Sequence, residues 1–129
     1  MVGIVIISHS SKVAEGVKEL ALQMVDNINI VAAGGTKENE IGTDIEKIIL
    51  AINKVYSEDG VVILFDLGSA YMNAQMAIET LSEQMQTKVK ILDSALVEGA
   101  IVVAVQSSIG KNLIEIQEAV KGLCLHKTP

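Results

Sequence analysis

Aromatic and basic side chains are scarce in this sequence. Its 129 residues include one Phe, two Tyr and no Trp, and acidic residues outnumber basic ones, so that the net charge is −6 at pH 7. So few rings leave little for stacking nucleic-acid bases or for enclosing a flat cofactor. A negatively charged chain is also poorly matched to phosphate backbones and anionic lipids, because both attract basic proteins. We therefore expect no nucleic-acid partner, no membrane partner and no cofactor.

Cysteine, proline and long apolar runs are equally rare. Cys124 is the single cysteine, which excludes an internal disulfide or a thiolate metal cluster and fits a reducing cytoplasm. No apolar run approaches the ~18 residues of a membrane helix, and no basic leader precedes the first apolar run. Since 50% of the residues are apolar, a sizeable core is available. We expect one cytoplasmic domain over residues 1–129 with no metal site.

Apolar runs alternate with amphipathic segments along the whole chain. Four runs have the length and composition of buried strands, at residues 3–7, 28–33, 61–65 and 89–92. Helical spacing of apolar residues follows at about 11–24, 45–56, 72–81, 97–108 and 113–123. The order βαβαβαβαα predicts an α/β fold, an open and mainly parallel four-stranded sheet with helices on both faces. We adopt the strand order 2-1-3-4, which is common for such chains.

Hydroxyl residues mark the predicted helix starts. Ser10 and Ser11 stand where the first helix begins, and Ser69 is the expected N-cap of the third. Thr43 and Glu46 have capping-box spacing at the start of the second helix.

Two chemically useful side chains fall at the predicted binding crevice. In an open parallel sheet this crevice lies beyond the carboxyl ends of the strands where the strand order reverses, here between the first and third strands. The first strand leads to His9 and the third leads to Asp66. A carboxylate that holds one imidazole nitrogen fixes the tautomer and leaves the other nitrogen nucleophilic. We therefore interpret His9 as a candidate nucleophile and Asp66 as its orienting partner.

Small residues around this pair could receive a phosphoryl group. The helix start at Ser10 and Ser11 would offer free N–H groups to an anion beside His9, and Gly68-Ser69 forms a second close-approaching loop. Gly35 and Thr43 lie beyond the second strand on the same rim. The plain alternative is that His9 is an ordinary surface residue and that Asp66 only caps the third helix.

Four separate stretches of the sequence resemble one known family. They are, in chain order, IVIISHSSKVAE at 4–15, AAGGTKENEIGTDIEK at 32–47, LFDLGSAYMNAQMAIE at 64–79 and LVEGA at 96–100. They resemble the phosphotransferase subunits of the phosphoenolpyruvate-dependent dihydroxyacetone kinases, the DhaM family, over nearly the whole chain. Wider relatives are the mannose-type enzyme IIA domains of the sugar phosphotransferase system, which share the histidine after strand one and the aspartate after strand three.

This resemblance implies a phosphoryl carrier. Members accept a phosphoryl group from the histidine phosphocarrier protein and pass it to ADP on the nucleotide-binding subunit DhaL, which phosphorylates dihydroxyacetone on the subunit DhaK. By position, His9 is the phosphorylated residue and Asp66 orients it. The positions that match phosphoryl-group-binding loops of the family are Ser10, Ser11, Gly35, Thr43, Gly68 and Ser69. Relatives form homodimers, and some continue into fused phosphocarrier domains that this sequence lacks, so we expect separate upstream proteins to supply the phosphoryl group.

Two features depart from the family pattern. Ala95 stands where a proline is expected before Leu96, which puts a different backbone in that crevice loop. No fifth strand follows the fourth predicted helix. Mannose-type domains exchange such a strand across their dimer, so we expect a homodimer here to use another surface, such as the last two helices.

Two other functions share the predicted fold. A flavodoxin-like domain would bind FMN or a nucleotide through Ser8, Ser10 and Ser11, although it needs flat aromatic contacts. A receiver domain phosphorylated on aspartate needs a cluster of carboxylates around Mg²⁺, whereas the first strand here ends in SHSS.

Overall fold

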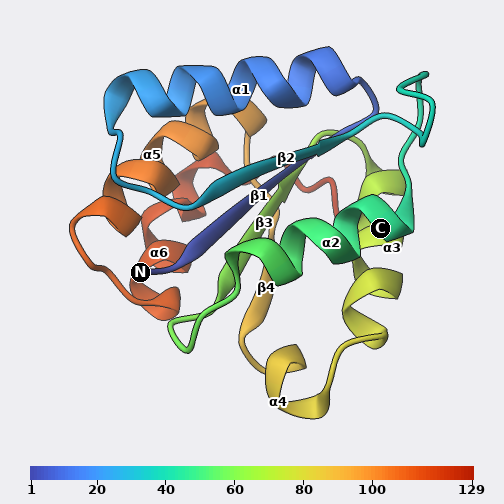
Figure 1. Ribbon diagram of the computed structural model, residues 1–129. Helices are drawn as coiled ribbons and strands as arrows, with labels where there is room; N and C mark the ends of the chain where they lie inside the picture. The colour runs from blue at the N-terminus through green and yellow to red at the C-terminus, as the bar shows by residue number, and fades with distance from the viewer.

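The computed structural model describes residues 1–129 and contains one parallel sheet (Figure 1). Its strand order is β2-β1-β3-β4, and every pair of neighbours runs parallel. The strands are β1 (Gly3–Ser8), β2 (Ile30–Gly34), β3 (Val61–Phe65) and β4 (Val89–Leu92). The predicted α/β fold and its 2-1-3-4 order are therefore confirmed.

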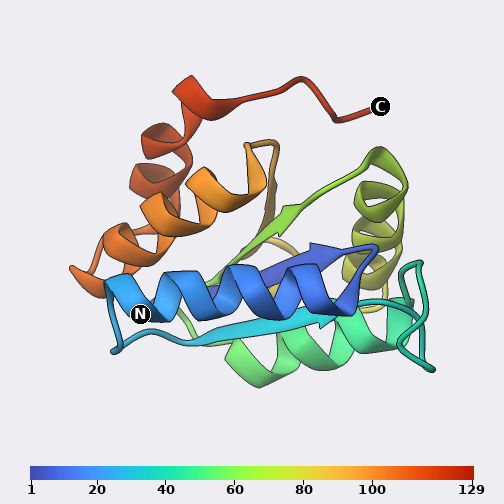
Figure 2. The same ribbon diagram turned by 90° about the horizontal axis from the view of Figure 1, so that it is seen from above.

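Helices cover both faces of this sheet (Figure 2). One face carries α1, α5 and α6, and the other carries α2 and α3. The helices are α1 (Ser11–Met24), α2 (Ile45–Val55), α3 (Gly68–Glu79), α4 (Glu83–Gln86), α5 (Leu96–Ser108) and α6 (Leu113–Ala119), followed by the short 3₁₀ helix η1 (Lys121–Leu123). None of these helices combines the length and the apolar character needed to cross a lipid bilayer.

The two central strands are buried along their whole length because they are covered on both faces. Side chains alternate between the faces, so Ile4 and Ile6 pack towards α1 and α5 while Val5 and Ile7 pack towards α2 and α3. The register pairs Ile7 with Phe65 at the carboxyl ends of β1 and β3. These ends therefore stop side by side, at one edge of the molecule.

Glycine at position 3 permits close packing at the opposite end of β1. A Cβ atom added there would lie 2.7 Å from the Cβ of Val55, the last residue of α2. Such a distance is well inside van der Waals contact, so the helix end would have to move. This glycine lets α2 cross directly over the start of the central strand.

Two predicted helix starts are wrong in detail. The N-cap of α2 is Asp44, whose carboxylate accepts from the Lys47 N–H, and Thr43 lies one residue before it. Helix α3 begins at Gly68 after Leu67, so Ser69 lies within its first turn and provides no cap. Ser10 is the N-cap of α1, as predicted, with its hydroxyl 3.2 Å from the Val13 N–H.

The remaining differences concern short elements. The second strand begins at Ile30, two residues later than expected, and the four-residue helix α4 was not predicted. The last predicted helix is divided into α6 and η1. The start of α6 is held by a capping box between Asn112 and Glu115, whose spacing in the sequence is typical of a helix start.

Candidate phosphotransfer site

His9 and Asp66 face one another where β1 and β3 end. His9 follows directly after β1 and Asp66 directly after β3, and the two strands are neighbours in the sheet. The His9 Nδ1 atom lies 2.9 Å from the Asp66 Oδ1 atom, and the His9 backbone N–H donates to Oδ2 at 2.9 Å. The structure therefore brings together the two residues that the crevice rule selected.

Asp66 is held by four hydrogen bonds, two on each carboxylate oxygen. Besides the two from His9, the Ser8 hydroxyl donates to Oδ2 at 2.8 Å and the Leu67 N–H donates to Oδ1 at 2.7 Å. Burial by itself would raise the pKa of this carboxyl group, but the bonds from His9, Ser8 and Leu67 outweigh it and hold the pKa below its ordinary value. Asp66 is therefore ionised and acts as an acceptor at neutral pH.

An ionised Asp66 selects one tautomer of the His9 ring. A carboxylate only accepts hydrogen bonds, so we assign the proton of the neutral ring to Nδ1. The lone pair then lies on Nε2, which is 2.6 Å from the Ser69 hydroxyl. This hydroxyl donates to Nε2 from the second residue of α3. The His9 side chain is 20% exposed, so Nε2 can be reached from solvent.

Two helices begin close to His9: α1 starts two residues after it, and α3 carries Ser69, whose hydroxyl contacts the ring. Within α1 the N–H groups of Ser11 and Lys12 donate to no other group of the protein, and neither do those of Gly68 and Ser69 within α3. Unpaired N–H groups of this kind, together with the positive end of the helix dipole, favour an anion. The helix starts beside His9 are therefore suited to a negatively charged group.

The loop between β2 and α2 closes over the backbone of His9. The Gly42 N–H donates to the His9 carbonyl at 2.8 Å, and the Gly35 N–H donates to the Ser8 carbonyl at 3.1 Å. Gly35 has a φ of 74°, a left-handed conformation that a residue with a Cβ atom rarely adopts. Thr43 makes no hydrogen bond to His9; its hydroxyl accepts one from the Asn73 side chain of α3. The loop is thus hydrogen-bonded both to the chain at the end of β1 and to α3.

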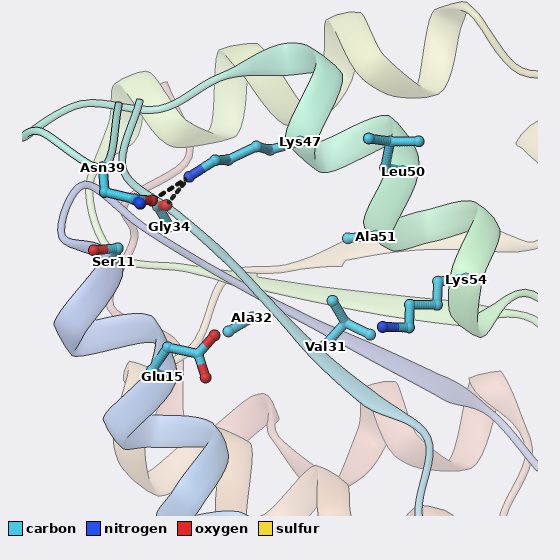
Figure 3. Close-up of a pocket in the computed structure, with 10 residues that line it drawn as sticks. All are labelled: Ser11, Glu15, Val31, Ala32, Gly34, Asn39, Lys47, Leu50, Ala51 and Lys54. Atoms are coloured by element: carbon cyan, nitrogen blue, oxygen red, sulfur yellow. Dashed lines mark hydrogen bonds between the residues drawn. The ribbon is translucent and has the colours of Figure 1, made fainter. Parts of the chain in front are cut away.

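Lys47 fastens the same loop from α2, beside a cavity of about 510 Å³ (Figure 3). Its ammonium group donates to the Gly34 carbonyl at 3.0 Å and to the Asn39 side chain at 2.8 Å. The cavity lies along the β2 edge between α1 and α2, and Ser11 is its only lining residue from the predicted site. Neither His9 nor Asp66 lines any of the four cavities of the structure. His9 is therefore partly exposed at the surface, outside these cavities.

The predicted residues thus fall into two groups. Asp66 and Ser69 are each hydrogen-bonded to one nitrogen of the His9 ring, and Ser10 is the N-cap of the helix that follows His9. The other predicted residues, which make no hydrogen bond to the His9 ring, are Ser11, Gly35, Thr43 and Gly68. The hydrogen bond from Ser8 to Asp66 was not predicted from the sequence. A hydroxyl residue at the end of a buried strand, as Ser8 is, could have indicated it.

Comparison with known proteins places this chain in a family of α/β domains of the sugar phosphotransferase system. The family model described as the fructose IIA component of the PTS system, EIIA-man, matches residues 3–117. A DhaM protein of Listeria innocua, the phosphoryl donor subunit of PEP-dependent dihydroxyacetone kinase 2, is 39% identical over 83% of this chain and 86% of its own length. The chain therefore belongs to the EIIA-man family and, within it, to the DhaM group.

Other relatives differ in how much of their length is matched. DhaM of Lactococcus lactis, the phosphotransferase subunit of a PTS-dependent dihydroxyacetone kinase, is 34% identical over 97% of this chain and 98% of its own length. DhaM of Escherichia coli is 39% identical over 90% of this chain but only 25% of its own length. The chain thus spans about a quarter of that relative.

Two solved structures share the fold. The crystal structure of a protein of unknown function superposes with a TM-score of 0.85 and 33% identity, covering 95% of this chain and 94% of the other. A sigma-54 interaction domain protein from Enterococcus faecalis superposes with a TM-score of 0.72 and 16% identity, covering 93% and 87%. At that identity the second match concerns the fold alone.

Proposed function

We propose that this chain is a phosphoryl donor subunit of a dihydroxyacetone kinase system and that it carries the phosphoryl group on Nε2 of His9. One observation carries the proposal: Asp66 holds Nδ1 at 2.9 Å, which leaves the nucleophilic lone pair on Nε2, the ring nitrogen at the exposed contact with Ser69. The names of the matched relatives, phosphoryl donor subunits among them, support the same reaction class.

Transfer to the chain is a substitution at phosphorus. The Nε2 lone pair of neutral His9 attacks the phosphoryl group on a phosphohistidine of the histidine phosphocarrier protein, so one N–P bond forms while the donor's N–P bond breaks. The Ser69 hydroxyl, 2.6 Å from Nε2, turns away from the ring and donates to a phosphoryl oxygen instead. The His9 ring becomes cationic while it holds the group, and the Asp66 carboxylate stabilises that charge.

Transfer onward reverses these steps. A phosphate oxygen of ADP, held by the nucleotide-binding subunit DhaL, attacks the phosphorus, and the N–P bond of His9 breaks. The ring returns to its neutral form with the proton still on Nδ1. The free N–H groups of Ser11, Lys12, Gly68 and Ser69 steady the phosphoryl oxygens during both transfers. Dihydroxyacetone, bound by DhaK, receives the group from the resulting ATP.

An intact-mass measurement tests this function. The protein is incubated with phosphoenolpyruvate, enzyme I and the histidine phosphocarrier protein, and its mass is compared with that of a sample lacking the phosphocarrier protein. We expect one phosphoryl group that is labile in acid and stable in base, because protonation of the ring weakens an N–P bond. Adding DhaL with ADP should remove it. Absence of the label in the complete mixture would refute the proposal, and a colourless protein would exclude bound flavin.

The oligomeric state stays a prediction. We expect a homodimer, and two exposed apolar side chains at the turn between α5 and α6 support the last two helices as its surface: Ile109 is 63% exposed and Ile114 is 71% exposed. Sedimentation analysis of the protein and of Ile114→Glu tests this surface. A dimer that is unaffected by Ile114→Glu would place the interface elsewhere.

A further inference from the structure

The segment after η1, residues 124–129, returns to the edge of the sheet where His9 lies. In both overall views the chain ends beside the start of α3 (Figures 1 and 2). The Lys127 carbonyl is 3.5 Å from where a Cβ atom of Gly68 would stand. We call residues 124–129 the return segment. It borders the loop that carries Asp66 and Ser69, although it is about sixty positions away in the sequence.

Lys127 is the residue through which the return segment holds the sheet. Its ammonium group donates to the Phe65 carbonyl at 2.7 Å and to the Ser94 carbonyl at 2.8 Å. The β3–β4 ladder ends with the pair Leu64 and Leu92, so both carbonyls lie just beyond it. Lys127 therefore links the two chain segments at the point where backbone pairing stops. Since Phe65 immediately precedes Asp66, the link restrains the backbone that orients the carboxylate.

Asp93 fixes the return segment in this position. Its carboxylate accepts from the Leu125 N–H at 3.3 Å, and from the Thr128 N–H at 2.8 Å and the Thr128 hydroxyl at 2.9 Å. His126, between them, has a φ of 56°, which turns Lys127 towards the sheet. A segment held from both sides of Lys127 keeps the ammonium group at one place.

The ammonium group also brings a positive charge close to the site. It lies 4.6 Å from the centre of the Phe65 ring, a cation–π contact on a fully buried ring. Burial lowers the pKa of Lys127, and the nearby carboxylates of Asp93 and Asp66 oppose that shift. Because the ammonium group is bound to the carbonyl of Phe65, the residue before Asp66, its charge lies close to the Asp66 backbone. A phosphoryl group on His9 adds up to two negative charges to this neighbourhood, which already holds two carboxylates.

We propose that Lys127 is a positioning residue of the phosphotransfer site: it braces the β3–α3 turn through the Phe65 and Ser94 carbonyls, and its charge stabilises the phosphorylated form of His9. The inference rests on the proposed function and adds a residue that no motif indicates. A brace alone would alter the rate at which phosphoryl groups are transferred. A charge that favours phospho-His9 also alters the equilibrium of transfer, and this separates the two roles.

The test measures that equilibrium. Purified phosphorylated phosphocarrier protein is mixed with wild type, Lys127→Met or Lys127→Arg, and the phosphorylated fraction of each protein is read by intact mass once it is constant. We expect Lys127→Met to shift the equilibrium constant towards the phosphocarrier protein by about fivefold to tenfold, the order for one partly exposed charge beside a dianion. Lys127→Arg, which keeps the charge, should stay within about twofold of wild type.

Matched controls make the result decisive. Lys121→Met removes an equal charge from an exposed residue that pairs only with Glu118, and it should leave the equilibrium unchanged. Phosphoramidate, which phosphorylates histidine without any protein donor, gives an independent measure of phospho-His9 lifetime, expected to be shorter in Lys127→Met. If Lys127→Met does not fold, Asp93→Asn replaces it as the test, because this variant releases the return segment and keeps Lys127. Asp93→Asn should also shift the equilibrium constant towards the phosphocarrier protein and shorten the phospho-His9 lifetime.

Failure of this inference is distinct from failure of the function. Wild type that accepts no phosphoryl group from the phosphocarrier protein would refute the proposed function. Wild type that accepts it while Lys127→Met has the same equilibrium constant and the same phospho-His9 lifetime would overturn the role of Lys127 alone. An equal loss in Lys127→Met and Lys127→Arg would overturn it as well, because charge would then be irrelevant.

Discussion

Replacing Asp66 by Asn is the sharpest change that the site allows, because it keeps the shape of the side chain and removes only its charge and half of its acceptors. Asp66 accepts two hydrogen bonds on each oxygen. An amide has one oxygen, so in either orientation its NH₂ group faces two donors. Placed at Oδ1, it meets the Leu67 N–H and forces Nδ1 of His9 to accept, which moves the ring proton to Nε2 and removes the nucleophile. Placed at Oδ2, it meets the backbone N–H of His9.

Both orientations leave a backbone donor without a partner and an imidazolium without a counter-charge. The cationic ring loses a charged hydrogen bond that contributes about 1.5–3 kcal/mol. Where the amide moves the ring proton, the resting ring must also give up a neutral hydrogen bond of about 1 kcal/mol before Nε2 can attack. The barrier therefore rises by about 2.5–4 kcal/mol. At about 1.4 kcal/mol for each factor of ten, phosphorylation of His9 should slow by about 10² to 10³.

Rapid-quench measurement of His9 phosphorylation by the phosphocarrier protein gives the rate, and ¹⁵N chemical shifts of the ring give the tautomer. Asp26→Asn is the matched control, since it removes the same charge from an exposed residue between α1 and β2. Near-ultraviolet and far-ultraviolet circular dichroism should be unchanged in both variants. A rate for Asp66→Asn within about threefold of wild type would refute the assignment and leave Asp66 a residue that only holds the β3–α3 turn through the Leu67 N–H.

Three further outcomes follow from the same structure. His9→Ala should abolish acid-labile labelling, and label that survives in this variant would mean another acceptor. Ser69→Trp should weaken the binding of both the phosphocarrier protein and DhaL, because on the proposed function both reach Nε2 through one transient docking face of less than about 1,200 Å². Simultaneous binding of both partners in a titration would contradict this shared docking face. The pKa of Asp66 is lower in the folded state than in the unfolded state, so ionised Asp66 contributes to the free energy of unfolding above the unfolded-state pKa near 4. This contribution is lost as the pH falls through the folded-state pKa. In urea unfolding, the difference in free energy of unfolding between wild type and Asp66→Asn should therefore narrow below about pH 4. A gap that stays constant with pH would show that the bonds to Asp66 do not depend on its charge.

The fold could be predicted from the sequence because its signals are local. The apolar runs at 3–7 and 61–65 are long enough to be buried on both faces and end abruptly in polar residues. Parallel strands end at the same edge, so His9 and Asp66 could be placed together before any contact was known. Ser10 could be identified as a cap for the same reason, since a cap bonds within three residues of itself.

Other features depended on partners that are distant in the sequence. Thr43 has the right spacing for a capping box, yet Asn73 of α3 occupies its hydroxyl and Asp44 caps the helix instead. Serine is a common N-cap residue, but Ser69 instead makes a hydrogen bond to His9, because β1 and β3 are neighbours in the sheet.

Lys127 shows the limit most clearly, because no pattern near residue 127 indicates an ion that bridges two strand ends. The sequence by itself determined which segments are buried and where each strand stops, because those depend on apolar periodicity and on hydrogen bonds between near neighbours. Only the tertiary structure decided which side chain each carbonyl and hydroxyl at the rim would meet. Those pairings are set by how the helices cross the sheet, and a hydrogen bond forms only where the crossing brings its two atoms within about 3 Å.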